Sequence, residues 1–207
     1  MSGPLGVILA GGLSTRMGGG EKSLLEINGQ TLMARVIARL APQVDGVVIN
    51  ANRSPDHFAG FGFAVIADET KDFSGPLAGI LAGMDWAAAA GRSHIVTVAA
   101  DTPFFPIDLV QRFEKTAQAT GADIVLAATP DPKRGMARHP TFGLWPTALR
   151  EDLRTALRHG VRKVVAWSDT HPNAQVEFAV TAVDPFFNVN TPEDMDRAAK
   201  YLAEGLV

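Results

Sequence analysis

Short apolar runs alternate with amphipathic stretches along this chain, and this alternation limits the possible folds more than any other feature. The runs are rich in β-branched and aromatic residues, and several are continuously apolar, as is typical of strands buried on both faces of a sheet. We predict strands at residues 6–10, 47–50, 64–66, 95–99, 124–128, 142–145 and 163–167. Alternating strands and helices favour an α/β fold with a mostly parallel central sheet and helices on both faces.

Helical patterns lie between these runs. One apolar stripe at helical spacing consists of Leu32, Met33, Val36, Ile37 and Leu40, and another of Leu109, Val110, Phe113 and Ala117. Near the end, "TPED" offers Thr191 as an N-cap, a proline at the first helical position and an acid three residues after the cap. The polar, proline-rich and basic segment 129–140 is expected to be a long surface loop.

Length and composition exclude several classes of protein. The 207 residues suit a single domain, 1–207, and the net charge of −3 gives no basic surplus for nucleic acid. Without cysteine there is no disulfide, thiolate metal site or cysteine nucleophile. The most apolar helical stretch, 76–91, contains Asp85 and is too short to span a bilayer. We therefore expect a cytoplasmic protein that binds neither nucleic acid nor membrane.

The stretch "GVILAGGLSTRMGGGEK", residues 6–22, has six glycines, five of which come after the first predicted strand. In open α/β sheets, ligands bind beyond the carboxyl ends of strands, and glycine lets backbone N–H groups approach phosphate oxygens. Arg16 and Lys22 add positive charge, so the loop suits a nucleoside triphosphate; a flexible connection is the alternative. It is not a P-loop, because Glu21 precedes Lys22, nor a dinucleotide fingerprint, because Ser23 takes the last glycine position.

A carboxylate also follows a predicted strand, in "HIVTVAADTPFFP". Magnesium on a nucleotide is usually held by one or two carboxylates together with phosphates and waters. Asp101 by itself would be read as a residue that caps a turn. Together with the glycine loop on the first strand, a magnesium ligand becomes the better interpretation.

Several motifs in series extend the pattern over nearly the whole chain. "LAGGLSTRMGGGEKSLLEINGQTL" is followed in order by "VVINANR", "VIADE", "GPLAGI", "ADTPFFP", "RHPTFGLW" and "FFNVNTPED". This series resembles the molybdenum cofactor nucleotidyltransferases, and among them the guanylyltransferases. The resemblance implies a Rossmann-like nucleotidyltransferase fold. It also implies Mg²⁺-dependent transfer of GMP from GTP to the phosphate of molybdenum-molybdopterin, by in-line displacement at the α-phosphorus that releases pyrophosphate.

The resemblance also implies roles for individual residues. The half at about 1–105 would bind the nucleotide and the half at about 106–207 the acceptor. The implied nucleotide-binding residues are Leu9, Ala10, Gly11, Gly12, Lys22, Asn50, Asp68 and Asp101. The catalytic residues would be Lys22, Arg16 and Asp101, with Mg²⁺ on Asp101 and, from the wider fold, near Asn190. Related cytidylyltransferases typically have alanine where this chain has Gly11, and Gly12 leaves room for a purine, which favours GTP.

The acceptor is large and anionic, so the basic segment with Arg134, Arg138 and His139 is a candidate to receive it, with Asn188 nearby. Ordinary solvated surface charges are the alternative. Proteins that insert the cofactor and the molybdoenzymes themselves are expected partners. Three other functions stay open: a molybdopterin cytidylyltransferase, a sugar-phosphate nucleotidyltransferase of the same fold, and a non-catalytic nucleotide-binding regulator or adaptor.

Overall fold

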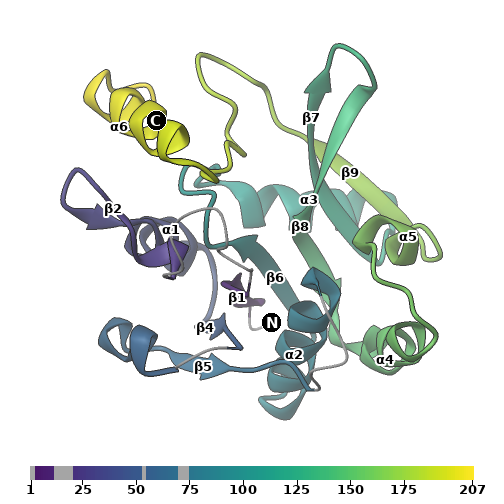
Figure 1. The fold of residues 1–207 in the computed structure, drawn as a ribbon. Helices are drawn as coiled ribbons and strands as arrows, with labels where there is room; N and C mark the ends of the chain where they lie inside the picture. The colour runs from purple at the N-terminus through teal and green to yellow at the C-terminus, as the bar shows by residue number, and fades with distance from the viewer. Residues whose placement is uncertain (1–2, 12–20, 53–54, 70–74) are drawn as a thin grey trace.

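The computed structural model describes residues 3–11, 21–52, 55–69 and 75–207. Seven strands form the central sheet in the order β5-β4-β1-β6-β8-β7-β9 (Figure 1). They are β1 (Leu5–Leu9), β4 (Val47–Asn50), β5 (Ala64–Ile66), β6 (His94–Ala99), β7 (Ile124–Asp131), β8 (Gly135–Pro146) and β9 (Asn173–Glu177). The strand β8 runs antiparallel to both of its neighbours, β6 and β7, whereas the other pairs are parallel. The predicted mostly parallel sheet is confirmed.

Helices cover both faces of this sheet, as predicted. The helices α1 (Leu32–Leu40) and α3 (Leu109–Thr120) pack on one face. The helices α2 (Pro76–Ala89), α4 (Arg150–Arg158) and α5 (Val164–Ser168) pack on the other. Within the part of the chain that the structure describes, no helix is both long and apolar enough to cross a membrane.

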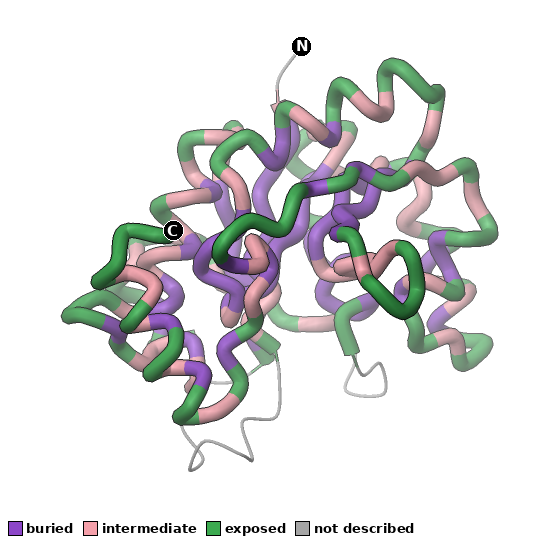
Figure 2. Tube along the Cα trace, turned by 90° about the horizontal axis from the view of Figure 1, so that it is seen from above, coloured by how far each residue is buried: buried purple, intermediate pink, exposed green. Residues whose placement is uncertain are grey.

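The strands divide the core into two layers because successive side chains of a strand point to opposite faces. On β1, Ile8 belongs to the layer under α1 and α3, whereas Val7 belongs to the layer under α2. On β6, Val96 and Val98 face the first layer and Ile95 the second. The buried segments accordingly run through the middle of the molecule (Figure 2).

A third apolar cluster brings the end of the chain back to the sheet. The helix α6 (Pro192–Ala203) lies beside β2 (Glu26–Ile27), which pairs with β3 (Gln30–Thr31) in a small separate hairpin. Ile27, Phe104 and Val189 are buried together there. The Thr191 side chain accepts a hydrogen bond from the Asp194 backbone N–H in a capping box, which confirms the predicted helix start. This packing returns the segment before α6 to the end of β6.

The predicted strand at 163–167 is wrong, because these residues form α5. Val164 and Trp167 are both buried, at the i, i+3 spacing of one helix face, against the α2 side of the sheet. The edge position in the sheet belongs instead to β9, where Val176 is buried between exposed neighbours. Only one buried apolar residue marks this strand, so its sequence gives a weak strand signal.

The predicted long loop at 129–140 is also wrong, because β7 and β8 continue through it as a hairpin. The turn is closed by Asp131, whose Oδ1 accepts hydrogen bonds from the backbone N–H groups of Lys133 and Arg134 at 2.8 Å each. Gly135 has a φ of 76°, which only glycine adopts without strain. Turn chemistry in the middle of a polar segment therefore produces a tight hairpin.

Candidate active site at the carboxyl ends of the strands

The first group of polar side chains in the candidate site meets just beyond β6. The Lys22 Nζ donates hydrogen bonds to Asp101 Oδ2 at 2.7 Å and to Asn190 Oδ1 at 2.5 Å. Lys22 begins the short 3-10 turn Lys22–Leu24, Asp101 follows β6, and Asn190 precedes α6. The lysine side chain is only 14 % exposed, so this ion pair is partly shielded from water. The structure thus brings three predicted site residues together from distant parts of the sequence.

The fold holds two of these residues in place through the backbone. The Val189 N–H donates to the backbone oxygen of Asp101 at 2.9 Å. The Asn190 N–H donates to Asp194 Oδ2 at 2.8 Å, so the capped start of α6 fixes this asparagine. The carboxylate of Asp101 and the amide oxygen of Asn190 consequently converge on one cationic nitrogen.

This donor set suits a magnesium ion. Carboxylate and amide oxygens are hard ligands, and Mg²⁺ is usually bound through one or two carboxylates and the phosphates of its substrate. The two oxygens already share one positive charge, the ammonium of Lys22. Among the described residues there is no cluster of three or more histidine, cysteine, aspartate or glutamate side chains that would form a complete protein cage. The oxygens of Asp101 and Asn190 therefore fit as two ligands of a metal ion.

The second group lies beyond β4 and β5. The Asn50 Nδ2 donates to Asp68 Oδ1 at 2.9 Å, and the Asn52 Nδ2 donates to Asp68 Oδ2 at 2.7 Å. The Asp68 N–H in turn donates to Asn52 Oδ1 at 2.8 Å. Asn50 is buried, with 3 % exposed, whereas Asn52 is exposed. The asparagine at position 52 stands in the "VVINANR" motif but is not among the predicted site residues; its position two residues after Asn50 was the available signal.

The end of β1 lies between the two groups, because β1 pairs with β4 on one side and β6 on the other. The Ala10 N–H donates to the backbone oxygen of Asn50 at 2.9 Å, and the backbone oxygen of Leu9 accepts from the Ala100 N–H at 3.1 Å. Gly11 is exposed beside them. The chain leaves β1 towards β4 and returns through α2 to β6, so this is the switch point where open α/β sheets bind ligands. The predicted residues Gly12 and Arg16 lie outside the described residues.

Of the predicted acceptor-binding residues, Arg134, Arg138 and His139 lie in the first part of β8 or the turn before it, whereas Asn188 directly precedes Val189 beside the first group. Because β8 runs antiparallel to β6, its first residues lie at the same end of the sheet as Asp101. The Arg138 guanidinium forms two hydrogen bonds with Asp169, at 2.6 and 3.1 Å, and these hold the pKa of that carboxyl below its ordinary value. Arg134 and Asn188 are exposed.

His139 is half-buried in an aromatic cluster. Its ring stacks on Phe186 with the centroids 4.3 Å apart, and its Nε2 lies 2.9 Å from Thr129 Oγ1. Burial lowers the pKa of His139, and the negative charge of Asp184 opposes this shift. The neutral ring is therefore the favoured form here, and His139 carries less positive charge than the sequence interpretation assumed.

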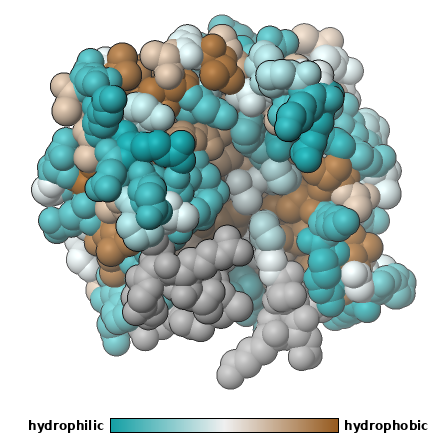
Figure 3. All heavy atoms as spheres, turned by 45° about the horizontal axis from the view of Figure 1, so that its top comes forward, coloured by the Kyte–Doolittle hydropathy of each residue, from teal (hydrophilic) through white to brown (hydrophobic). Residues whose placement is uncertain are grey.

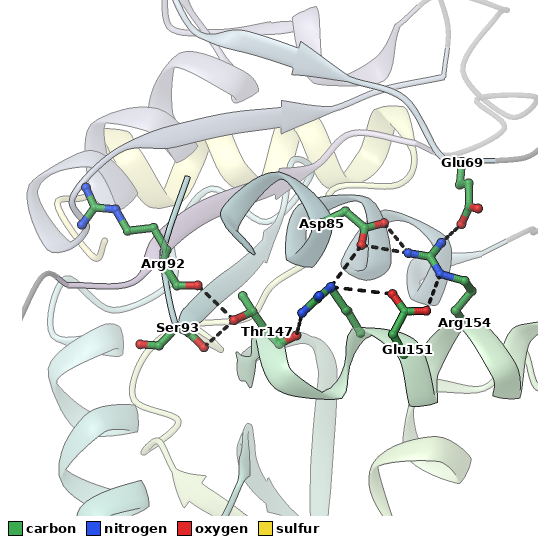
Figure 4. Close-up of polar contacts among 8 residues, drawn as sticks. Glu69, Asp85, Arg92, Ser93, Thr147, Glu151 and Arg154 are labelled. Carbon is green, nitrogen blue, oxygen red and sulfur yellow. Dashed lines mark hydrogen bonds and ion pairs between the residues drawn. The ribbon is translucent and has the colours of Figure 1, made fainter. Parts of the chain in front are cut away.

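An ion-pair network connects α2 and α4 to the residue after Asp68, and the sequence does not predict it. Arg154 on α4 donates to both oxygens of Asp85 on α2 at 2.9 Å, and it also contacts Glu151 and Glu69 (Figure 4). Glu69 directly follows Asp68 in the chain. Two helices on one face of the sheet are thus tied to the segment that carries the second group. On the face drawn in Figure 3 the surface is hollowed near its centre, with hydrophobic residues in the hollow and hydrophilic residues around it.

Comparisons with known proteins agree with this arrangement. The family model of the MobA-like NTP transferase domain matches residues 6–174. A molybdenum cofactor guanylyltransferase of Bradyrhizobium sp. (strain ORS 278) is 47 % identical over 201 residues, which cover 96 % of this chain and 92 % of that protein. One of Rhodopseudomonas palustris (strain BisB5) is 49 % identical over 197 residues, which cover 94 % and 91 %.

Solved structures share the fold. Molybdopterin-guanine dinucleotide biosynthesis protein A from Archaeoglobus fulgidus matches with a TM-score of 0.74 at 22 % identity, covering 97 % of this chain and 99 % of that one. The 4-diphosphocytidyl-2C-methyl-D-erythritol synthase from Anaerococcus prevotii matches with a TM-score of 0.76 at 12 % identity, covering 98 % and 96 %. The resemblance seen in the sequence motifs is confirmed, and the chain belongs to the MobA-like NTP transferase family.

Proposed function

We propose that this protein transfers GMP from GTP to the phosphate of molybdenum-molybdopterin, which yields the guanine dinucleotide form of the cofactor and pyrophosphate. The curated relatives that are 42–49 % identical carry the name molybdenum cofactor guanylyltransferase, and they support GTP and molybdopterin as the substrates. The observation that carries the proposal is the convergence of Lys22, Asp101 and Asn190 at the switch point of the sheet.

The attacking group is a phosphate oxygen that is already anionic, so the reaction needs no strong base. Positioning and charge stabilisation then supply most of the catalysis. Lys22 provides a positive charge for the triphosphate, and we assign the same role to Arg16. We propose that Asp101 and Asn190 hold Mg²⁺, which would offset negative charge on the phosphates. The backbone at Gly11 and Gly12 would approach the nucleotide closely, because the Ala10 N–H is already bonded to the Asn50 backbone oxygen.

We assign guanine recognition to Asp68. Guanine presents two adjacent donors, N1–H and the N2 amine, and a carboxylate accepts both. Asn50 is buried, and its Nδ2 donates to Asp68 Oδ1 at 2.9 Å and to the backbone oxygen of Ile66 at 3.4 Å. Its part is therefore to hold the carboxylate rather than to bond the base. We also assign Gly12 to the base site, because a residue without a side chain would leave room for a purine.

For the acceptor, the candidates remain Arg134, Arg138, His139 and Asn188. Arg138 would have to exchange Asp169 for the acceptor phosphate, whereas Arg134 and Asn188 are exposed. Cofactor-inserting proteins and molybdoenzymes would receive the product. We place the reaction in the cytoplasm, where GTP is available, and assign no role to nucleic acid or membrane.

The test compares the wild-type protein with Asp101→Asn in the transfer of labelled GMP to molybdenum-molybdopterin. We expect transfer to fall about 10²–10³-fold in the variant, the scale for losing one electrostatic group in an active site, while GTP binding measured by calorimetry persists. Asp108→Asn, which changes an exposed aspartate at the start of α3, should keep wild-type activity. Chelation of the metal should abolish transfer by the wild type.

Three outcomes would contradict the proposal. Undiminished transfer by Asp101→Asn would refute the assigned mechanism. A wild-type preference for labelled CTP would indicate a cytidylyltransferase. Binding of GTP with no transfer, in the presence of Mg²⁺ and acceptor, would indicate a non-catalytic regulator.

A further inference from the structure

We propose that Asn52 is the positioning residue for guanine recognition: it fixes the Asp68 carboxylate in advance, so that the two remaining acceptor positions of this carboxylate face the base. This inference rests on the proposed function, because it concerns the same nucleotide site. It gives a role to a residue that lies outside the predicted site.

Asn52 uses both ends of its amide on one partner. Its Nδ2 donates to Asp68 Oδ2 at 2.7 Å, and its Oδ1 accepts from the Asp68 N–H at 2.8 Å. These two bonds join the backbone and the carboxylate of Asp68 through a single side chain, which restricts the rotation of the Asp68 side chain. Because Asn52 is exposed, burial of its side chain does not explain this arrangement.

Asn50 completes the arrangement from the buried side. Its Nδ2 donates to the other carboxylate oxygen, Asp68 Oδ1, at 2.9 Å. A carboxylate has about four lone-pair positions on its two oxygens. Among the described residues, one asparagine donates to each of these oxygens, and we assign the second position on each oxygen to a ligand.

The two remaining positions match guanine and not the other common bases. Guanine offers N1–H and the N2 amine side by side as donors. Adenine offers an amine beside an acceptor nitrogen, and cytosine does the same, so neither can fill both positions. A site built to accept two hydrogen bonds rejects a ligand that lacks one of the donors, because a polar group is then left unpaired. Fixing Asp68 beforehand also avoids the entropy cost of ordering it when GTP binds.

Two variants test whether Asn52 positions the Asp68 carboxylate or only stabilises the local turn. Asn52→Asp keeps an Oδ1 acceptor for the Asp68 N–H but replaces the Nδ2 donor with a carboxylate oxygen that faces Asp68 Oδ2. Asn52→Ala removes both bonds. Gln175→Glu is the matched control for the added charge, because Gln175 is exposed on the edge strand β9. Thermal unfolding of each variant establishes that it is folded.

The measurements are kcat and KM for GTP and for ITP, which lacks the N2 amine. For Asn52→Asp and Asn52→Ala we expect KM for GTP to rise about 10-fold or more with kcat little changed, and the preference for GTP over ITP to shrink. In Asn52→Asp, two facing carboxylates disfavour simultaneous ionisation, so the rise in KM for GTP at low pH should begin at a higher pH than in the wild type.

The inference is overturned if both variants keep the wild-type KM and the wild-type preference for GTP over ITP. It is equally overturned if they lose kcat in the same proportion for GTP and ITP, since that pattern means general damage to the fold. A wild-type protein that transfers no GMP from GTP refutes the proposed function instead, so the two failures are distinguishable.

Discussion

At the scale of single residues, Gly79 decides how closely α2 can approach the candidate site. A Cβ at this position would lie 2.2 Å from Asn50 Oδ1 and 2.8 Å from Leu9 Cδ2, closer than a Cβ atom comes to a non-bonded neighbour. Asn50 is buried and bonded to Asp68, so it has little freedom to move aside. Because Gly79 has no side chain, Asn50 can keep the position in which it holds Asp68.

We expect Gly79→Ala to raise KM for GTP several-fold, whereas Gly83→Ala leaves it unchanged. Gly83 lies one turn later in α2, and its Cβ would lie 2.7 Å from Val7 Cγ2, so this matched control is crowded without touching Asn50. Each substitution overpacks the core, at a cost of about 1–3 kcal/mol, and regains about 1 kcal/mol of helix propensity. Urea denaturation and steady-state kinetics measure both effects; an equal rise in KM for the two variants would contradict the assigned role of Gly79.

The sequence predicted part of the candidate site at this scale. Lys22, Asp101 and Asn190 were each named, and the structure brings them together. Lys22 stands at the end of the glycine-rich loop, Asp101 follows a predicted strand and Asn190 precedes a capped helix, and the family resemblance points to all three. The role of Asn52 was missed because its bonds run to a residue sixteen positions away, and a turn asparagine looks the same in a sequence.

At the scale of elements, Arg154 joins α4 and α2 to the segment after β5. Burial raises the pKa of Asp85, and the nearby charge of Glu151 raises it further, while Arg150 opposes the shift. The two hydrogen bonds from Arg154 offset the cost of keeping this carboxylate ionised. Figure 4 shows the same guanidinium reaching Glu69, so the network also supports the segment with Asp68.

We expect Arg154→Met to lower the free energy of unfolding by about 1–2 kcal/mol at pH 7, a value discounted because Asp85 is partly exposed. A carboxyl whose pKa is raised in the folded state does not lower the free energy of unfolding at pH values below its unfolded pKa, about 3.9. The free energy of unfolding falls as the pH rises from there through the folded pKa. The difference in free energy of unfolding between the wild type and Arg154→Met should therefore be small near pH 4 and grow towards pH 7. Denaturation at several pH values, with Arg158→Met on the same helix as control, tests this; a deficit independent of pH would argue against it.

Elements with a strong pattern were predicted and those that depend on distant contacts were not. The stripes of α1 and α3 and the capping box of α6 are local signals, and the structure contains all three helices. The residues of α5 were assigned to a strand because a five-residue apolar run has no clear period. The edge strand β9 was missed because its place in the sheet is decided by pairing with β7, which local sequence does not encode.

At the scale of the whole molecule, the sheet crosses the boundary between the proposed nucleotide-binding and acceptor-binding halves. The strand β6 belongs to the first half and pairs with β8 of the second. The Val189 N–H donates to the Asp101 oxygen, and Val189 packs with Ile27 and Phe104. The second half thus completes both the hydrogen bonding and the apolar core of the first, so the proposed single domain should unfold as one unit.

We therefore expect GTP, bound in the first half, to stabilise the second half by the same amount. Trp86→Phe removes a tryptophan that is 45 % exposed and leaves Trp145 and Trp167, both buried in the second half, as the fluorescent reporters. Ligand at 100 times its Kd stabilises the folded state by about 2.7 kcal/mol. In one cooperative unit, GTP with Mg²⁺ should shift the denaturation midpoint equally by fluorescence and by far-UV circular dichroism, and the two curves should coincide. A fluorescence midpoint that ignores GTP would mean that the halves unfold separately, and that the contacts across β6 and β8 do not couple them.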